Sequence, residues 1–138
     1  MTDSELIAKQ LAFVETMVAD LRRLARPEHI EIDIREERFV AHTLQMAAQA
    51  ALDVASHIVS DERLGEPSTN REMFELLERA GWLTSSLAAR MQAMAGFRNL
   101  VVHGYAKVDP RILRDIATNR LGDLLEFTAA IRGRIQPP

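Results

Sequence analysis

The chain has 138 residues, which is within the usual size of one domain and long enough to bury a hydrophobic core. Apolar residues make up 47%, charged residues 27%, and the net charge is −3, which excludes a disordered chain and argues against a protein that coats nucleic acid. Cysteine is absent and no apolar run could span a bilayer, which excludes disulfides, thiolate metal sites and membrane insertion. The first residues lack a signal-peptide pattern, so we expect a single domain over residues 1–138, in the cytoplasm.

Apolar residues at helical spacing predict two helices in the first half of the chain. Thr2 and Glu5 form a capping box that begins a first helix, which should run to about Leu24. A broader apolar face predicts a long central helix that begins near Ile34 and ends before Gly65. These two helices would contribute much of the core.

The next segment predicts a short helix followed by a longer one. Thr69 and Glu72 form a second capping box ahead of REMFELLERA (71–80), and Gly81 follows as the terminating residue. A fourth helix should begin at Thr84 or the residue after it and continue into the polar string described below.

Asp109 and Pro110 are typical of an N-cap and a first helical position, and they predict a last helix that runs to about Arg134. No segment alternates with the period of a strand. We therefore expect an all-α fold, an up-and-down bundle of four longer helices and one short helix.

Four polar side chains gather where the fourth helix should end. Arg98, Asn99, His103 and Tyr105 surround two valines and Gly104. On an ideal helix Arg98 and His103 would lie about 140° apart, but a helix that unwinds at Gly104 would let His103 and Tyr105 turn toward Arg98. The alternative is an ordinary helix end, with a surface arginine, a histidine near the carboxyl terminus of the helix and a packed tyrosine.

The charge distribution permits an RNA partner for this end of the chain. Residues 98–138 carry seven Lys/Arg against four Asp/Glu, a balance of +3, whereas the rest of the chain is acidic. Lys9 and Lys107 are the two lysines among the 17 basic residues, so the others are arginines, which suit forked contacts with phosphate.

These residue types fit cleavage of RNA without a metal. His103 could act as general acid or base, and Arg98 could stabilise charge on the reacting phosphate. Asn99 could orient the phosphate or the imidazole, or be a surface amide. One histidine cannot easily act on both sides of phosphorus, so we expect a homodimer, or a higher homo-oligomer, that brings two copies of this helix end into one cleft.

The string FRNLVVHGY (97–105) resembles the R-x4-H-x-Y signature of HepT-like toxins in the HEPN superfamily of small helical ribonucleases. The segment IREERFVAHTLQMAAQAALDVASHIV (34–59) is similar to the long second helix of that family. The resemblance covers roughly residues 30–130. It implies a metal-independent endoribonuclease toxin of a type VII-like toxin–antitoxin system, without a cofactor, that cleaves an RNA such as tRNA or mRNA in a composite dimer site.

The resemblance also implies a partner. The antitoxin of HepT-like systems is a minimal nucleotidyltransferase that transfers AMP to the tyrosine matching Tyr105. Bulk and negative charge there would block a phosphate site beside Arg98. Tyr105 is then a regulatory residue or an RNA contact, and the alternative is a tyrosine that only packs.

Asp53 lies in an apolar stretch of the central helix and needs a partner. We expect it to pair with Arg98 or Arg35, either in support of the site or as a structural ion pair. Asp53 and His57 could instead bind a metal, but no further ligand follows at suitable spacing, so no metal site is expected.

Two other functions remain open. The chain could be a non-catalytic helical module that dimerises and binds a nucleotidyltransferase, with the Arg98–Tyr105 cluster as its AMP acceptor or nucleotide pocket. It could also be a structural helical protein in which the motif is a coincidence.

Overall fold

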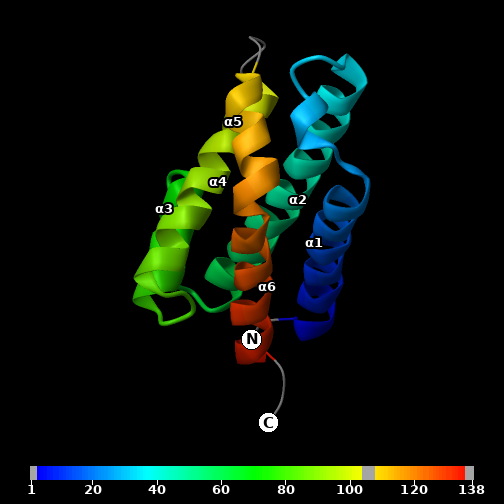
Figure 1. Ribbon diagram of the computed structural model, residues 1–138. Helices are drawn as coiled ribbons and strands as arrows, with labels where there is room; N and C mark the ends of the chain where they lie inside the picture. Colours follow the sequence, from blue (N-terminus) through cyan, green and yellow to red (C-terminus); the bar gives the residue numbers. More distant parts are fainter. Residues whose placement is uncertain (1–2, 104–107, 136–138) are drawn as a thin grey trace.

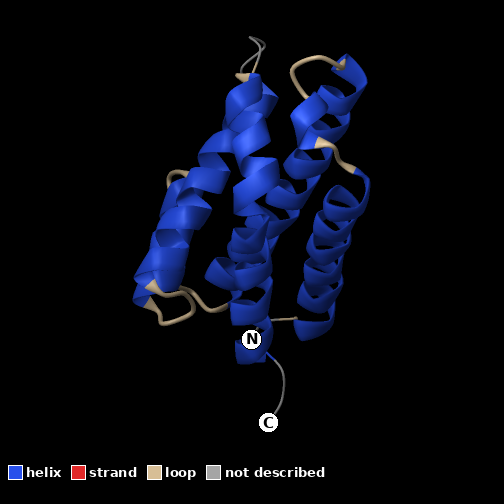
Figure 2. Cartoon of the chain, viewed as in Figure 1, coloured by secondary structure: helices blue, strands red, loops and turns tan. Residues whose placement is uncertain are grey.

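A computed structural model describes residues 3–103 and 108–135, with the side chain of His103 outside the described part. Most of these residues are helical, loops connect the helices, and no strand occurs among them (Figure 2). The elements, in chain order, are α1 (Ser4–Leu24), the 3-10 turn η1 (Pro27–His29), α2 (Ile34–Asp61), α3 (Asn70–Arg79), α4 (Ser85–His103), α5 (Pro110–Asp115), the π-helical segment η2 (Ile116–Arg120) and α6 (Leu121–Ile135). The expected all-α bundle is confirmed.

Side-chain caps set most of the helix starts. Thr69 accepts a hydrogen bond from the Glu72 amide at the start of α3 (3.2 Å), and Asp109 accepts one from the Arg111 amide at the start of α5 (2.9 Å). The start of α1 differs from the prediction: Asp3 is the N-cap and accepts from the amide of Leu6 (3.1 Å). Because α1 begins at Ser4, Glu5 stands too early in the helix to complete a capping box.

The helices form a bundle in which α2 is central (Figure 1). Helix α1 packs along α2 on one side, α4 and the shorter α3 lie on the other, and the α5–α6 run crosses in front of α2 in the view of Figure 1. Five buried alanines on α2 let neighbouring helices approach closely, and Phe74 meets Phe127 edge to face with ring centroids 6.0 Å apart. The buried alanines are Ala47, Ala48, Ala50, Ala51 and Ala55. One continuous core results.

The carboxyl-terminal helix contains an interruption that the sequence pattern does not predict. Residues 110–135 are helical throughout, but Ile116–Arg120 adopt π-helical hydrogen bonding between α5 and α6. The apolar spacing continues across this segment, so Ile116 and Leu121 are both buried. Arg114 on α5 also bonds Glu31, ahead of α2, at 2.6 Å. None of the described helices has the length and apolar character needed to cross a membrane.

Candidate functional site

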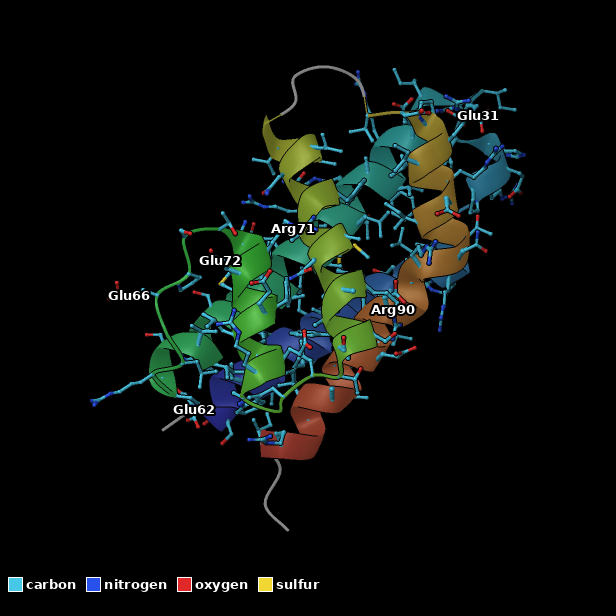
Figure 3. All side chains as sticks on the ribbon, turned by 90° about the vertical axis from the view of Figure 1, so that its left-hand side faces the viewer. Glu31, Glu62, Glu66, Arg71, Glu72 and Arg90 are labelled. Carbon is cyan, nitrogen blue, oxygen red and sulfur yellow. The ribbon has the colours of Figure 1, made fainter. Side chains whose placement is uncertain are left out.

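Helix α4 carries the predicted site residues Arg98, Asn99 and His103 and is fixed on two sides (Figure 3). Toward α3, Arg71 Nη1 donates to the carbonyl oxygen of Gln92, and Gln92 Nε2 donates to that of Arg71, both at 3.3 Å. Toward α6, Arg90 donates to Asp123 Oδ1 and Glu126 Oε2, both at 2.8 Å. Hydrogen bonds to Glu126 and Asp123 raise the pKa of Arg90 above its ordinary value, so this clamp stays charged.

Arg98 belongs to a chain of hydrogen bonds that joins three helices. Its Nε donates to Gln49 Oε1 on α2 (2.6 Å), and Gln49 Nε2 donates onward to Asp53 Oδ1 (2.8 Å). Its Nη1 donates to Asn99 Oδ1 (3.0 Å), which also accepts from Asn70 Nδ2 at the start of α3 (3.4 Å). We call these five residues the Arg98 chain. It links Arg98 directly to Asn99 and, only through Gln49, to Asp53, and it adds two residues that the sequence did not single out.

Within the described part of the chain, the oxygens that accept from Arg98 belong to amides and none to a carboxylate. Its Nη2 and one hydrogen of Nη1 therefore remain for a ligand. Asn99 accepts through Oδ1, so its Nδ2 hydrogens are also available. The site thus offers donors, one of them charged, for the non-bridging oxygens of a phosphate.

The predicted ion pair of Asp53 with Arg98 or Arg35 is wrong. Asp53 is exposed on the outer face of α2, where water solvates its carboxylate, and it reaches Arg98 only through Gln49. Arg35 is exposed and pairs with the helix N-cap Asp33 at 3.6 Å. The amide of Gln49 stands one turn from Asp53 and offers both a donor and an acceptor, so it can bridge the two charged groups.

Arg98 and Asn99 line an open hollow of about 630 Å³ between α4 and the start of α3. Its other lining residues are Ser68, Thr69, Asn70, Gly96 and Leu100. Gln49 and Asp53 line a second hollow, of about 450 Å³, between α1 and α2. The Arg98 chain therefore connects two adjoining depressions in the surface.

His103 is the last described residue of α4, and Gly104, where the sequence predicts that the helix unwinds, lies outside the described residues. The side chain of His103 and the whole of Tyr105 lie outside the described residues. Their predicted meeting with Arg98 therefore stays a prediction.

A metal site built from protein ligands does not occur in the described part of the chain: no three His, Asp or Glu side chains there are grouped to hold an ion. His57, one helical turn after Asp53, pairs with Asp61, one turn further along α2, at 3.3 Å.

A family model described as "Ribonuclease HepT-like" matches residues 10–131, nearly the whole helical bundle. The chain belongs to the HepT-like ribonuclease family. Among curated proteins of this family, the mRNA nuclease HepT of Shewanella oneidensis is 25% identical over 130 residues, 94% of this chain and 98% of the relative. The tRNA nuclease HepT of Aphanizomenon flos-aquae is 34% identical over 95 residues, 65% of each chain.

Solved structures give the same family resemblance. The tri-AMPylated HEPN toxin of Shewanella oneidensis, solved in complex with an MNT antitoxin, superposes with a TM-score of 0.86 at 25% identity and covers 96% of this chain and 99% of its own. The cytosolic protein YutE of Bacillus subtilis, of unknown function, has the same TM-score at 17% identity, which shows a shared fold. It covers 97% of this HepT-like chain and 91% of its own.

Two residues of the Arg98 chain, Gln49 and Asn70, were missed by sequence reasoning. Gln49 has a detectable signal: Gln45, Gln49 and Asp53 recur every four residues in the middle of α2, which marks a polar strip on one face. Asn70 has no such signal, because its contact with Asn99 spans 29 positions and depends on how α3 packs against α4.

Proposed function

We propose that this chain is a metal-independent endoribonuclease toxin, with Arg98 and His103 as its catalytic pair. The observation that carries the proposal is the state of Arg98: within an R-x4-H motif of a ribonuclease family, its guanidinium is held by neutral amides beside an open hollow, with donors to spare. Arg90, a half-buried arginine on the same helix, instead bonds two carboxylates that offset its charge.

The reaction needs no redox change and no co-reactant. The ribose 2′-oxygen attacks the adjacent phosphorus and forms a 2′,3′-cyclic phosphate as the bond from phosphorus to the 5′-oxygen breaks. A neutral His103 accepts the 2′-hydroxyl proton, and a protonated His103 donates a proton to the leaving 5′-oxygen. Arg98 stabilises the negative charge that builds on the non-bridging oxygens, with Asn99 as a further donor.

A second copy of the chain would supply the second histidine, and α4 carries a surface suited to it. Ala89, Ala93, Gly96 and Leu100 recur at spacings of four, three and four residues on the outward side of α4, and Leu100 is 55% exposed. We call these four residues the α4 face. An exposed apolar helix face is typical of a surface that contacts a partner, so this face suits a second chain.

The surroundings of the α4 face fit a twofold contact. With Ile112 and Ile116 it forms a hollow of about 560 Å³, whose rim carries charges of both signs. Gly96 and Leu100 also line the hollow that holds Arg98. An isologous dimer through this face would therefore bring two copies of the site into one cleft.

The antitoxin in this proposal is a small nucleotidyltransferase that transfers AMP to Tyr105. Support comes from the Shewanella oneidensis relative, which was solved as a tri-AMPylated toxin with an MNT antitoxin. AMP on Tyr105, seven positions from Arg98, would bring a phosphate that competes with RNA for the guanidinium. RNA and such a partner would both meet this chain in the cytoplasm.

Expression of this chain alone tests the proposal. Growth should arrest, and Arg98→Ala or His103→Ala should restore it, whereas Arg23→Ala, a change at an exposed arginine near the end of α1, should not. Co-expression with a cognate nucleotidyltransferase should relieve the arrest, and Tyr105→Phe should abolish that relief. Growth without arrest at high expression of the wild type would overturn the toxin assignment in favour of a non-catalytic binding module.

A further inference from the structure

We infer that Gln49 is the positioning residue of Arg98, and that its neutral amide holds the guanidinium in place without cancelling its charge. This inference rests on the proposed function, since Arg98 is the residue that contacts the phosphate there. The 2.6 Å hydrogen bond from Arg98 Nε to Gln49 Oε1 is the shorter of the two bonds that Arg98 makes within the described residues.

Asp53 fixes which way the Gln49 amide points. A carboxylate only accepts, so the Gln49 atom that meets Asp53 Oδ1 at 2.8 Å must be the Nε2 donor, and Oε1 is then turned to Arg98. An amide flipped by half a turn would set oxygen against oxygen at Asp53 and nitrogen against nitrogen at Arg98. The order Asp53, Gln49, Arg98 therefore has one hydrogen-bonded arrangement.

Bonding at Nε decides which edge of the guanidinium is left for substrate. With Nε directed at Gln49, the donors that remain are Nη2 and one hydrogen of Nη1, at the tip of the side chain. Two nitrogens at the tip can fork onto two oxygens of one phosphate. Because Gln49 holds the Nε side of the guanidinium, the Nη end faces the ligand.

The choice of an amide has an electrostatic consequence. Other half-buried arginines in this chain bond carboxylates: Arg132 pairs with Glu15 at 2.7 Å, and Arg90 pairs with Asp123 and Glu126 at 2.8 Å. Such partners offset the positive charge. Gln49 accepts a hydrogen bond from Arg98 as a carboxylate would, but it carries no net charge. Its side chain also stands between Arg98 and the Asp53 carboxylate, so the two charged groups do not touch.

Four variants of purified full-length protein test this inference in single-turnover RNA cleavage. Gln49→Ala should lower the rate at saturating protein about tenfold or more, the value of one hydrogen bond to a charged group, with a smaller change in the half-saturating concentration. Gln49→Glu should mainly weaken RNA binding, because a carboxylate would compete with the phosphate for Arg98. Asp53→Asn, whose amide can donate as well as accept and so no longer fixes which way the Gln49 amide points, should lower the rate, but by less than Gln49→Ala. Gln45→Ala is the matched control, one turn earlier on the same strip of α2, and it should leave cleavage unchanged.

A second readout does not depend on activity. In NMR spectra, the Arg98 Nε–H proton, assigned through Arg98→Lys, should exchange slowly with water in the wild type and in Gln45→Ala but rapidly in Gln49→Ala. Slow exchange retained in Gln49→Ala would overturn the role of Gln49, as would wild-type cleavage by Gln49→Ala and Gln49→Glu. If the wild type failed to cut RNA but Gln49→Ala still released the Arg98 proton, the positioning role would stand and the proposed nuclease would fail.

Discussion

Arg90, Arg114 and Arg132 each bond a carboxylate on another part of the bundle, at distances from 2.6 to 2.8 Å. These arginines connect different parts of the bundle, and the partner carboxylates offset their positive charges. Arg98 lies in the same bundle but bonds Gln49 and Asn99, which carry no charge. Arg98 therefore keeps a positive charge that its neighbours do not offset, beside a hollow that a ligand can enter.

A lysine at position 98 separates charge from geometry. Arg98→Lys keeps the positive charge but offers one nitrogen, which cannot bond Gln49 and fork onto a phosphate together. We expect RNA cleavage to fall by about tenfold or more, while RNA binding at low salt weakens less. Arg114→Lys serves as control, because Arg114 bonds the Glu31 carboxylate and is not a member of the Arg98 chain. Near wild-type cleavage by Arg98→Lys would mean that the forked contact is not needed.

At the scale of elements, α4 is held from two sides. Its first half is bonded to α3 through Arg71 and Gln92 and to α6 through Arg90. The buried alanines of α2 allow the close helix packing on which the short bond from Arg98 to Gln49 depends. Helix α1 is tied to α6 in turn by Glu15, which accepts from Arg132 Nε (3.1 Å) and Nη2 (2.7 Å).

The tie between α1 and α6 makes stability depend on pH. The hydrogen bond from Arg132 lowers the pKa of Glu15 below its ordinary value of 4.5. A carboxyl group with a lowered pKa in the folded state stabilises the protein above 4.5, and this contribution is lost as the pH falls through the folded-state pKa. We expect Glu15→Gln to be less stable than the wild type at pH 7, and the difference to shrink at pH 3. Urea unfolding at both pH values measures the difference in the free energy of unfolding between the two proteins. An equal difference at pH 7 and pH 3 would contradict this role of Glu15.

At the scale of the whole molecule, the bundle leaves the α4 face uncovered beside the site. Ile112, at the start of α5, is also 46% exposed and extends this apolar surface. A second copy would cover it and would complete a reaction that one histidine cannot easily perform on both sides of phosphorus.

Ala93→Glu tests the dimer, because it adds a charge to the centre of the α4 face at a position exposed in the single chain. We expect light scattering to report a dimer for the wild type and a monomer for Ala93→Glu, with cleavage lost alongside. Ala129→Glu, at an exposed alanine of α6, should remain dimeric and active. A wild-type monomer that cuts RNA, or an active dimeric Ala93→Glu, would refute the composite site.

Helix bounds could be predicted from the sequence because caps and apolar spacing act over a few residues, as at Thr69 and Asp109. The motif at Arg98 was found for the same reason. The partner of Arg98 was not, since Gln49 is 49 positions away and is brought close only by packing. Asp53 was assigned the wrong partner because opposite charges were matched without weighing an amide between them. The π-helical segment after Asp115 leaves the apolar spacing unchanged, so the pattern carried no sign of it.

Cleavage of cellular RNA by the purified protein in EDTA tests the central claim most directly. The wild type should cut RNA and leave 2′,3′-cyclic phosphate ends, and both Arg98→Ala and His103→Ala should be inactive with unchanged circular dichroism. If the wild type and these variants were equally inert at high protein concentration, or if cleavage required an added divalent metal, the account of Arg98 and His103 as a metal-independent catalytic pair would be contradicted.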